Sequence, residues 1–124
     1  MPDSPLRVTR TVRFSAAHRE PGDRIRGHDY RIDVTLSGRP DPVSGLFVNL
    51  AELDALLQRE LVALLADRLL DAQPELSARP VSCESIALFA AQRLERPLAT
   101  LAPARLHSIR VHESDDLYAE WERG

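Results

Sequence analysis

Two histidines and a glutamate are the residues of this chain whose types and positions best suit chemistry. His18 and His28 flank a short polar loop, and Glu113 ends an alternating apolar stretch near the C-terminus. Imidazole titrates near neutral pH and is a common zinc ligand, so the two histidines are candidates for metal binding or proton transfer. The alternative is a pair of structural histidines at a strand edge.

Alternating apolar and polar residues predict strands on both sides of that loop. Even-numbered positions are apolar across residues 6–17, with Arg10 as the exception, and again across residues 29–37. A period of two is typical of half-buried strands. Continuing this parity past both strands places His18 and His28 on their inward, apolar faces.

The same alternation returns over residues 106–113, where Ile109 and Val111 face inward. This parity places Glu113 and His107 on the inward face as well. Burial of an unpaired carboxylate costs several kcal/mol, so we expect Glu113 to have a hydrogen-bonding or charged partner. The alternative is a strand-end glutamate that turns back to solvent. Residues 115–121 are expected to add one more short strand.

Two helices are expected between these strand pairs. Asn49 is a candidate N-cap for a helix over about residues 50–65, which carries leucines at helical spacing. A loop rich in proline and serine leads to Ser82, the candidate N-cap of a second helix. Pro97 is expected to end that helix.

The predicted order is strand, strand, helix, helix, strand, strand, with no internal repeat or linker. This order indicates one α+β domain over residues 1–124, a four-stranded antiparallel sheet with two helices on one face. Such a sheet has exposed edges, which proteins commonly close by oligomerisation into a barrel. We therefore expect a homo-oligomer.

Composition excludes several kinds of protein. The net charge of -3 and the dispersed arginines argue against nucleic-acid binding, which needs clustered positive charge. All sixteen basic residues are arginine, so neither a Schiff-base lysine nor a P-loop lysine is available. Cys83 is the single cysteine and no apolar signal stretch or membrane span is evident, so we expect a cytoplasmic protein without membrane contact.

Two short motifs resemble a known family. F-S-A-A-H at residues 14–18 and R-G-H-D-Y at residues 26–30 are similar to the F-x-A-A-H and H-G-H-x-Y motifs of the 6-pyruvoyl-tetrahydropterin and 6-carboxytetrahydropterin synthases. The resemblance continues in order along nearly the whole chain. It implies the tunnelling fold, in which trimeric barrels stack in pairs as hexamers and bind small molecules in pockets between subunits.

The resemblance also implies a zinc ion held by three histidines, and this chain departs from that pattern. His18 and His28 match two of the ligands, but Arg26 stands at the third position. A guanidinium stays protonated and cannot ligate zinc. We therefore expect no cofactor, unless His107, Asp23 or a neighbouring subunit completes a zinc site.

The family's proton-transfer residues are replaced as well. Gly22 stands at the position of the family's catalytic cysteine, and L-A-D-R-L-L-D resembles the relay segment L-D-H-x-x-L-N with Ala66 and Asp67 at the Asp and His positions. If Arg26 and Asp67 share one pocket, they supply a cation and an acid or base for proton transfer or oxyanion stabilisation. The alternative is a salt bridge that fills the vacated metal site.

The substrate-anchoring positions are better retained. V-S-C-E-S-I-A resembles the family's P-T-x-E-N-x-A, which carries substrate binding over to Ser82 and Glu84, and I-R-V-H-E-S resembles V-x-V-x-E-T. The resemblance makes Glu113 the carboxylate that grips the guanidine-like edge of a pterin. Cys83 lies near a predicted helix N-terminus and is either a relocated nucleophile or an inert small apolar residue.

Three hypotheses follow. The first is a repurposed, metal-independent cyclase, lyase or isomerase that acts on a small heterocyclic or carbonyl substrate, with His18, Arg26, His28 and Asp67 as catalytic residues. The second is a pterin-binding or scaffold protein without turnover. The third is retention of the 6-carboxytetrahydropterin synthase lyase activity through a rebuilt zinc site.

Overall fold

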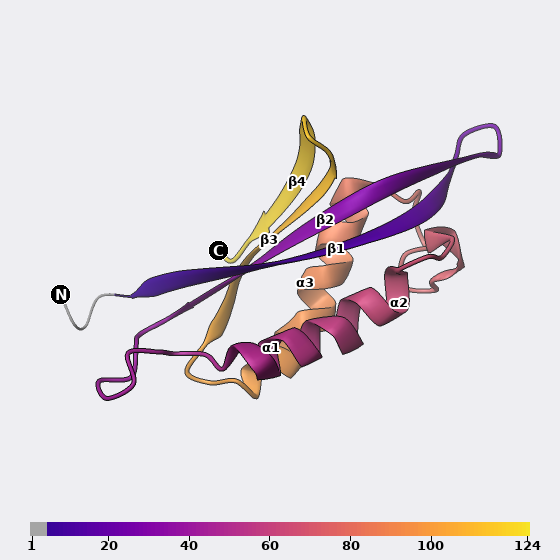
Figure 1. The fold of residues 1–124 in the computed structure, drawn as a ribbon. Helices are drawn as coiled ribbons and strands as arrows, with labels where there is room; N and C mark the ends of the chain where they lie inside the picture. The colour runs from indigo at the N-terminus through magenta and orange to yellow at the C-terminus, as the bar shows by residue number, and fades with distance from the viewer. Residues whose placement is uncertain (1–4) are drawn as a thin grey trace.

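The computed structural model describes residues 5–124, which form one antiparallel sheet covered on one face by helices (Figure 1). The sheet has the order β1-β2-β3-β4, and the predicted α+β class is confirmed. The strands are β1 (Leu6–Glu20), β2 (Arg24–Gly38), β3 (Arg105–Ser114) and β4 (Leu117–Glu122). The main helices are α1 (Leu50–Leu57), α2 (Ala63–Leu65) and α3 (Cys83–Ala99).

A long hairpin of β1 and β2 carries both histidines. The register pairs Ala16 with His28 and His18 with Arg26, so all four side chains leave the hairpin on the same face, as the sequence parity predicts. The connecting turn contains Gly22 with φ 85° and Asp23 with φ 61°, left-handed conformations that glycine and aspartate adopt more easily than most residues. The hairpin thus fixes the spacing of the two imidazoles through regular strand pairing.

The first predicted helix spans α1, a π-helical stretch at Gln58–Val62 and α2. The Asn49 side chain accepts a hydrogen bond from the Glu52 amide, which confirms the predicted N-cap. Arg10, the exception to the apolar parity of β1, forms two hydrogen bonds with Asp54 of α1 at 2.7 Å. A residue of the first helix therefore supplies the partner for this charge on the apolar face of β1.

The second helix, α3, begins as predicted and ends later than predicted. The Ser82 side chain accepts from the Ser85 amide, and the Ser85 hydroxyl lies 2.8 Å from the Ser82 amide, which completes a capping box. Pro97 does not end the helix, which continues to Ala99. Burial of Leu98 in the core favours this last turn, and a proline there removes only one amide donor.

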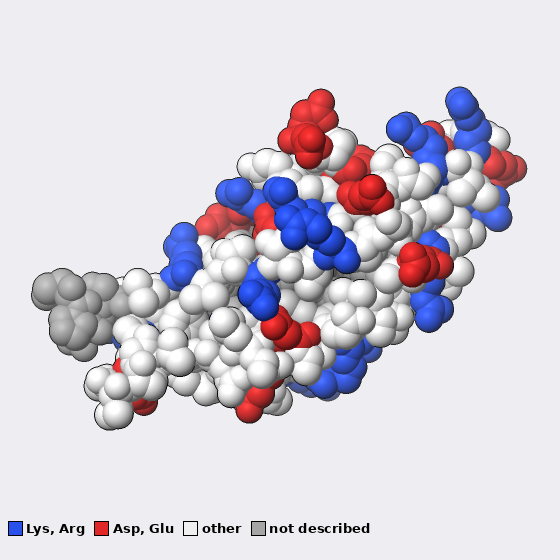
Figure 2. All heavy atoms as spheres, viewed as in Figure 1, with Lys and Arg blue, Asp and Glu red and all other residues white. Residues whose placement is uncertain are grey.

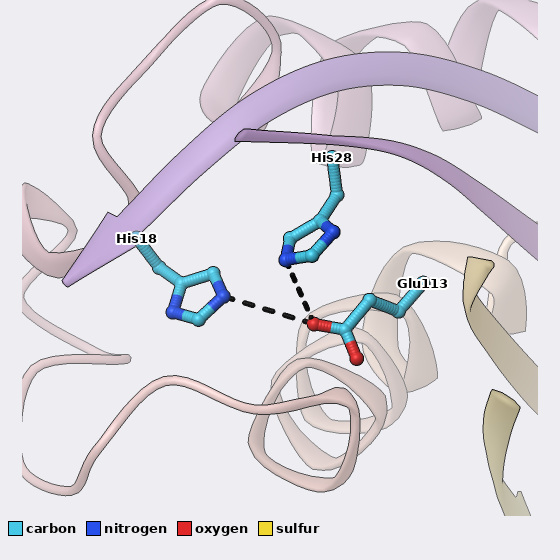
Figure 3. A group of neighbouring side chains, drawn as sticks. All are labelled: His18, His28 and Glu113. Carbon is cyan, nitrogen blue, oxygen red and sulfur yellow. Dashed lines mark ion pairs between the residues drawn. The ribbon is translucent and has the colours of Figure 1, made fainter. Parts of the chain in front are cut away.

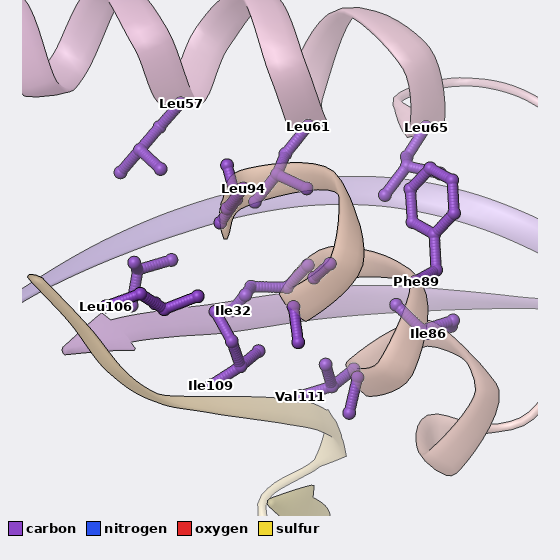
Figure 4. Packing of buried hydrophobic residues seen from close by; sticks show 14 of the residues in the cluster. Ile32, Leu57, Leu61, Leu65, Ile86, Phe89, Leu94, Leu106, Ile109 and Val111 are labelled. Carbon is purple, nitrogen blue, oxygen red and sulfur yellow. The ribbon is translucent and has the colours of Figure 1, made fainter. Parts of the chain in front are cut away.

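The core lies between the sheet and the helices, where aliphatic side chains from both layers interdigitate (Figure 4). Full burial of one such side chain contributes about 1.5–3 kcal/mol. Fully buried members include Ile32, Leu57, Leu61, Leu65, Ile86, Leu94 and Ile109. This core anchors the strand ends that carry the histidines.

The pairing of strand β3 is irregular at two residues, and one of the two bulges changes the predicted orientation of His107. The pairing with β2 skips His107, and the pairing with β4 skips Glu113. A bulge inverts the alternation of side chains, so the prediction that His107 shares the inward face with Glu113 is wrong. His107 instead lies 3.2 Å from Glu122 of β4 and belongs with polar side chains of the opposite face.

Strands β1 and β4 form the two edges of the sheet. Part of the β1 edge is covered within the chain, because Ala17 forms an isolated bridge with Leu69. Closure of the remaining edges by other subunits stays a prediction. Within the described residues, no helix has the length and apolar character needed to cross a membrane. On the face shown in Figure 2, basic and acidic side chains are interspersed.

Candidate functional site

Three strands bring His18, His28 and Glu113 together at one end of the sheet (Figure 3). The Glu113 Oε1 atom lies 3.0 Å from His28 Nε2 and 3.7 Å from His18 Nε2. The Glu113 side chain is 20% exposed, so it is not a strand-end glutamate turned into solvent. We call these three residues the inner cluster.

Neighbouring groups fix the two rings. His18 is 6% exposed, and its Nδ1 atom lies 3.2 Å from the Arg19 carbonyl oxygen. The rings of His18 and His28 stack with centroids 5.2 Å apart, and Tyr30 packs edge-on against His28 at 5.6 Å. Regular strand pairing and these contacts leave both Nε2 atoms directed at the carboxylate, as Figure 3 shows.

Neither Nε2 atom has a hydrogen bond, although both are buried. The 3.7 Å separation at His18 is too long for a hydrogen bond, and the 3.0 Å contact at His28 is an ion pair without a hydrogen bond. Buried polar atoms in folded proteins are nearly always paired, so unpaired atoms call for an explanation. Two unpaired nitrogens facing one carboxylate indicate a site that receives a proton, a cation or a ligand.

The Glu113 carboxylate also acts on Cys83 and Tyr30. The Cys83 Sγ atom lies 3.8 Å from Glu113 Oε2, within reach of a thiol hydrogen bond. Burial, with the nearby charge of Glu113 second, raises the pKa of Cys83 to about 11. The pKa of Tyr30 is also raised, first by burial and then by Glu113. A thiol with a raised pKa is a poor nucleophile, so the proposed nucleophile role of Cys83 is not favoured.

Arg26 and Asp67 do not pair. The Arg26 guanidinium is 60% exposed and lies 3.2 Å from Glu20 of the same hairpin. Asp67 is exposed and has φ 58°, a left-handed conformation held by its amide, which donates to the Ser15 carbonyl at 2.7 Å. Asp67 lines a hollow whose lining does not include Arg26, so the two residues do not form the expected pair.

A hollow of about 540 Å³ lies beside the inner cluster. Its lining includes His28, Asp67, Ser15 and Asp29. Ligand pockets commonly range over about 300–1,000 Å³, so the hollow has room for a small heterocycle. His28 belongs both to the inner cluster and to this lining, and Asp67 is the exposed acid that shares the hollow with it.

The remaining predicted site residues lie outside the inner cluster. Ser82 caps α3, and Glu84 is exposed in the first turn of that helix. Asp23 is exposed in the hairpin turn, and His107 pairs with Glu122. Among the described residues, neither Asp23 nor His107 joins His18 and His28 as a third zinc ligand.

Sequence reasoning missed a second histidine site, on the opposite face of the sheet. His112 Nε2 lies 2.9 Å from Asp33, and Asp33 also accepts a hydrogen bond from Thr11 at 2.7 Å. The Arg31 guanidinium lies 3.1 Å from the His112 ring. We call these four residues the outer network. The signal was available, because the outward parity of β2 and β3 places Arg31, Asp33 and His112 on one face.

The three-histidine zinc site implied by the resemblance does not fit this chain. The third position is Arg26, which has no lone pair to offer and is held by Glu20. No imidazole other than His18 and His28 lies in the inner cluster within the described residues.

The fold and the inner cluster together define a small α+β domain with a polar site at the ends of antiparallel strands. Comparison with known proteins identifies the family within this class. A sequence profile described as 6-pyruvoyl tetrahydropterin synthase matches residues 7–124, and the chain belongs to this family.

Individual relatives agree. The 6-pyruvoyl tetrahydrobiopterin synthase of Poecilia reticulata is 29% identical over 126 residues, covering 87% of this chain and 84% of that protein. The human protein of that name is 28% identical over 127 residues, covering 88% of this chain and 86% of its own length. The structure of Caenorhabditis elegans 6-pyruvoyl tetrahydropterin synthase superposes with a TM-score of 0.86 at 21% identity, covering 100% of this chain and 99% of that one.

Proposed function

We propose that the chain is an enzyme that rearranges a small heterocyclic or carbonyl substrate, through a cyclisation, elimination or isomerisation driven by proton transfer. The observation that carries this proposal is the inner cluster, in which two buried Nε2 atoms without hydrogen bonds face one carboxylate. His107 Nε2 also lacks a hydrogen bond, but it lies near its own carboxylate, Glu122, whereas His18 and His28 converge on the single carboxylate of Glu113.

In this proposal the substrate binds in the hollow beside the inner cluster. A ring or carbonyl compound bound there lies against His28 and Asp67, which both line it. Asp67 is exposed and can take a proton from a carbon or oxygen of the substrate. Its backbone is fixed by the hydrogen bond to Ser15, so the carboxylate starts from a defined position.

The imidazoles would act on the carbonyl oxygen of the substrate, whereas Asp67 takes the proton. Removal of a proton next to a carbonyl develops negative charge on the carbonyl oxygen. An imidazole beside that oxygen stabilises the charge or returns a proton to it. In this proposal His28 faces the substrate, and His18 and Glu113 hold the His28 ring in place.

Substitution of Asp67 tests the catalytic part of the proposal. A panel of pterins and dihydropterins with carbonyl-bearing side chains at position 6 is incubated with the protein, and products are followed by chromatography and absorbance. Asp67→Asn retains a side chain that tolerates the left-handed backbone, so folding is preserved. We expect kcat to fall by about 100-fold or more with little change in KM.

The matched control is Asp116→Asn, which removes an exposed carboxylate in the turn between β3 and β4. It should retain wild-type kcat. Equal kcat for Asp67→Asn and the wild type would exclude Asp67 as the proton acceptor.

A binding protein without turnover is the second candidate. The raised pKa of Cys83 and the glycine at position 22 favour it, because no reactive thiol is present at either place. This candidate predicts that pterin fluorescence is quenched when the protein binds the pterin, while no product forms with any member of the panel. Turnover that is lost in Asp67→Asn would exclude it.

A further inference from the structure

We propose that the face of the sheet opposite the helices binds the phosphate group of a small molecule between Arg13 of β1 and Arg31 of β2. The two residues are register partners in the hairpin. The site lies on the face of the outer network and does not depend on the proposed function. Guanidinium groups suit this ligand, because each presents several N–H donors in a fixed plane to the oxygens of a phosphate.

The cross-strand pairs on this face of the hairpin single out one position. Side-chain hydrogen bonds of 2.5–2.7 Å join three of the pairs: Thr9–Thr35, Thr11–Asp33 and Ser15–Asp29. The pair Arg13–Arg31 lies between the second and the third and places two positive charges directly opposite each other. Like charges opposite each other in a sheet are destabilising. An anion bound between the two guanidinium groups removes this repulsion.

The guanidinium of Arg13 is not neutralised by the described part of the chain. None of the described carboxylates forms an ion pair with it, and it donates no hydrogen bond to a described residue. The acids in the two adjacent pairs already accept hydrogen bonds, Asp29 from Ser15 and Asp33 from members of the outer network. Arg13 is also exposed, so a ligand in solution can reach its charge.

The outer network holds Arg31 in place and leaves part of its guanidinium for a ligand. His112 Nε2 lies 2.9 Å from Asp33, so this nitrogen carries the proton and Nδ1 accepts from Arg31 Nη2 at 3.1 Å. Arg31 Nε lies 3.5 Å from Asp33 on the same side. The remaining nitrogen, Nη1, has no hydrogen bond to a described residue, and the side chain is 42% exposed. Arg31 therefore presents an oriented donor.

A hollow of about 420 Å³ lies at this pair, with both arginines and His112 in its lining. Its volume falls within the range of about 300–1,000 Å³ that is common for small-molecule pockets. Asp29 and Asp115 also line it, so the hollow does not attract every anion, and binding requires direct contact with the guanidinium groups. Phosphate oxygens point in tetrahedral directions and can meet donors from two strands, whereas the two oxygens of a carboxylate lie in one plane.

Thermal melts with inorganic phosphate test the site. The full chain is melted at constant pH and ionic strength while sodium phosphate, or sodium acetate in a parallel series, replaces sodium chloride. A ligand that binds only the folded state raises the unfolding temperature by mass action. We expect a rise with phosphate concentration and a much smaller rise with acetate. Calorimetric titration then gives the phosphate Kd.

Arg13→Gln is the decisive variant. Loss of one charged donor group should raise the phosphate Kd by about tenfold or more. Without phosphate, Arg13→Gln should unfold at the same temperature as the wild type or slightly higher, because the repulsion from Arg31 is removed. The second measurement separates loss of the ligand from loss of the fold.

The matched control is Arg7→Gln, which removes an exposed arginine from the same face of β1. Arg7 stands opposite Ser37 instead of another arginine, and it does not line this hollow. The control carries the same change in net charge as Arg13→Gln and should bind phosphate like the wild type.

Three results would contradict the inference. A wild type that melts at the same temperature in phosphate as in chloride would exclude the site. An equal loss of phosphate affinity in Arg7→Gln would show that binding follows the net charge of the chain and not the Arg13–Arg31 pair. Equal stabilisation by acetate would overturn the assignment to phosphate.

Discussion

The chain contains two groupings of histidine and carboxylate, one on each face of the same sheet, and they differ in how their polar atoms are paired. In the outer network, Arg31 Nε lacks a hydrogen bond, but Asp33 accepts from His112 on one oxygen and from Thr11 on the other. In the inner cluster, both imidazole Nε2 atoms lack a hydrogen bond, and one carboxylate oxygen lies near both.

This difference separates a structural role from a chemical one. A carboxylate that accepts hydrogen bonds on both oxygens stabilises the fold, because each partner removes part of the desolvation cost of the other. Buried polar atoms without hydrogen bonds cost stability, and two of them converging on one carboxylate call for an explanation. We therefore assign the outer network to stability and the inner cluster to function.

The largest expected effect is on the pKa of Cys83, which reports burial of the thiol first and the nearby charge of Glu113 second. Burial and then Glu113 raise the pKa of the Cys83 thiol from 9.0 to about 11. The thiol stays protonated until the pH approaches that value, so at pH 8 the reactive thiolate is about 100-fold scarcer than for an unperturbed cysteine. Rates of alkylation by iodoacetamide in metal-free protein should rise up to about pH 11.

Glu113→Gln removes one of the causes, so its alkylation profile should shift to lower pH. Glu122→Gln should leave the profile unchanged. A wild-type profile centred near the ordinary thiol value of 9.0 would show that neither burial nor Glu113 raises the pKa of Cys83.

The second prediction breaks the outer network. Asp33→Ala leaves the His112 ring and the Thr11 hydroxyl without their carboxylate partner, so the free energy of unfolding should fall by about 1–3 kcal/mol. Urea denaturation measures the change. A double-mutant cycle with His112→Ala should give a coupling energy of at least about 0.5 kcal/mol. Additive effects would mean that the outer network is not a unit.

The third prediction applies the same measurement to the inner cluster. Glu113→Gln removes a partly buried charge that has no well-directed hydrogen bond from either histidine. The free energy of unfolding of the metal-free protein should therefore stay the same or rise by up to about 1 kcal/mol. A loss as large as that of Asp33→Ala would show that the inner cluster is a closed ion pair, and the contrast between the faces would disappear.

The sequence predicts the elements better than the contacts between them. Period-two alternation located β1 and β2 and placed His18 and His28 on the inner face, because parity is a local property. The same rule failed at His107, where a bulge in β3 inverts the alternation and no residue type marks it. The helix end was misplaced because burial of Leu98 outweighs the local effect of Pro97.

The inner cluster shows a further limit. The sequence singled out His18, His28 and Glu113, but it did not specify the contact between Glu113 and the two histidines, and the substrate-binding role of Glu113 stays a prediction. Residues 28 and 113 meet only through the pairing of β2 with β3, which depends on the register of distant strands. Arg26 was expected in the same pocket and instead pairs with Glu20, since both lie at the open end of the hairpin.

The smallest effect is expected at the Arg10–Asp54 pair, which separates pairing from burial. Its two hydrogen bonds at 2.7 Å are as short as any in the outer network, but both side chains are 45% exposed. Water competes for exposed charges, so Arg10→Ala should lower the unfolding temperature much less than Asp33→Ala does.

The pH dependence of this exposed pair has a definite sign. The hydrogen bond and charge of Arg10 lower the pKa of Asp54 below 3.8. The contribution of the pair is therefore complete above that pH and is lost as the pH falls below it. Melting curves of the wild type and Arg10→Ala should converge in acid and separate slightly near neutral pH. If Arg10→Ala lowered the unfolding temperature at neutral pH as much as Asp33→Ala does, burial would not be needed to explain the contrast between the two faces. Hydrogen-bond pairing alone would explain it.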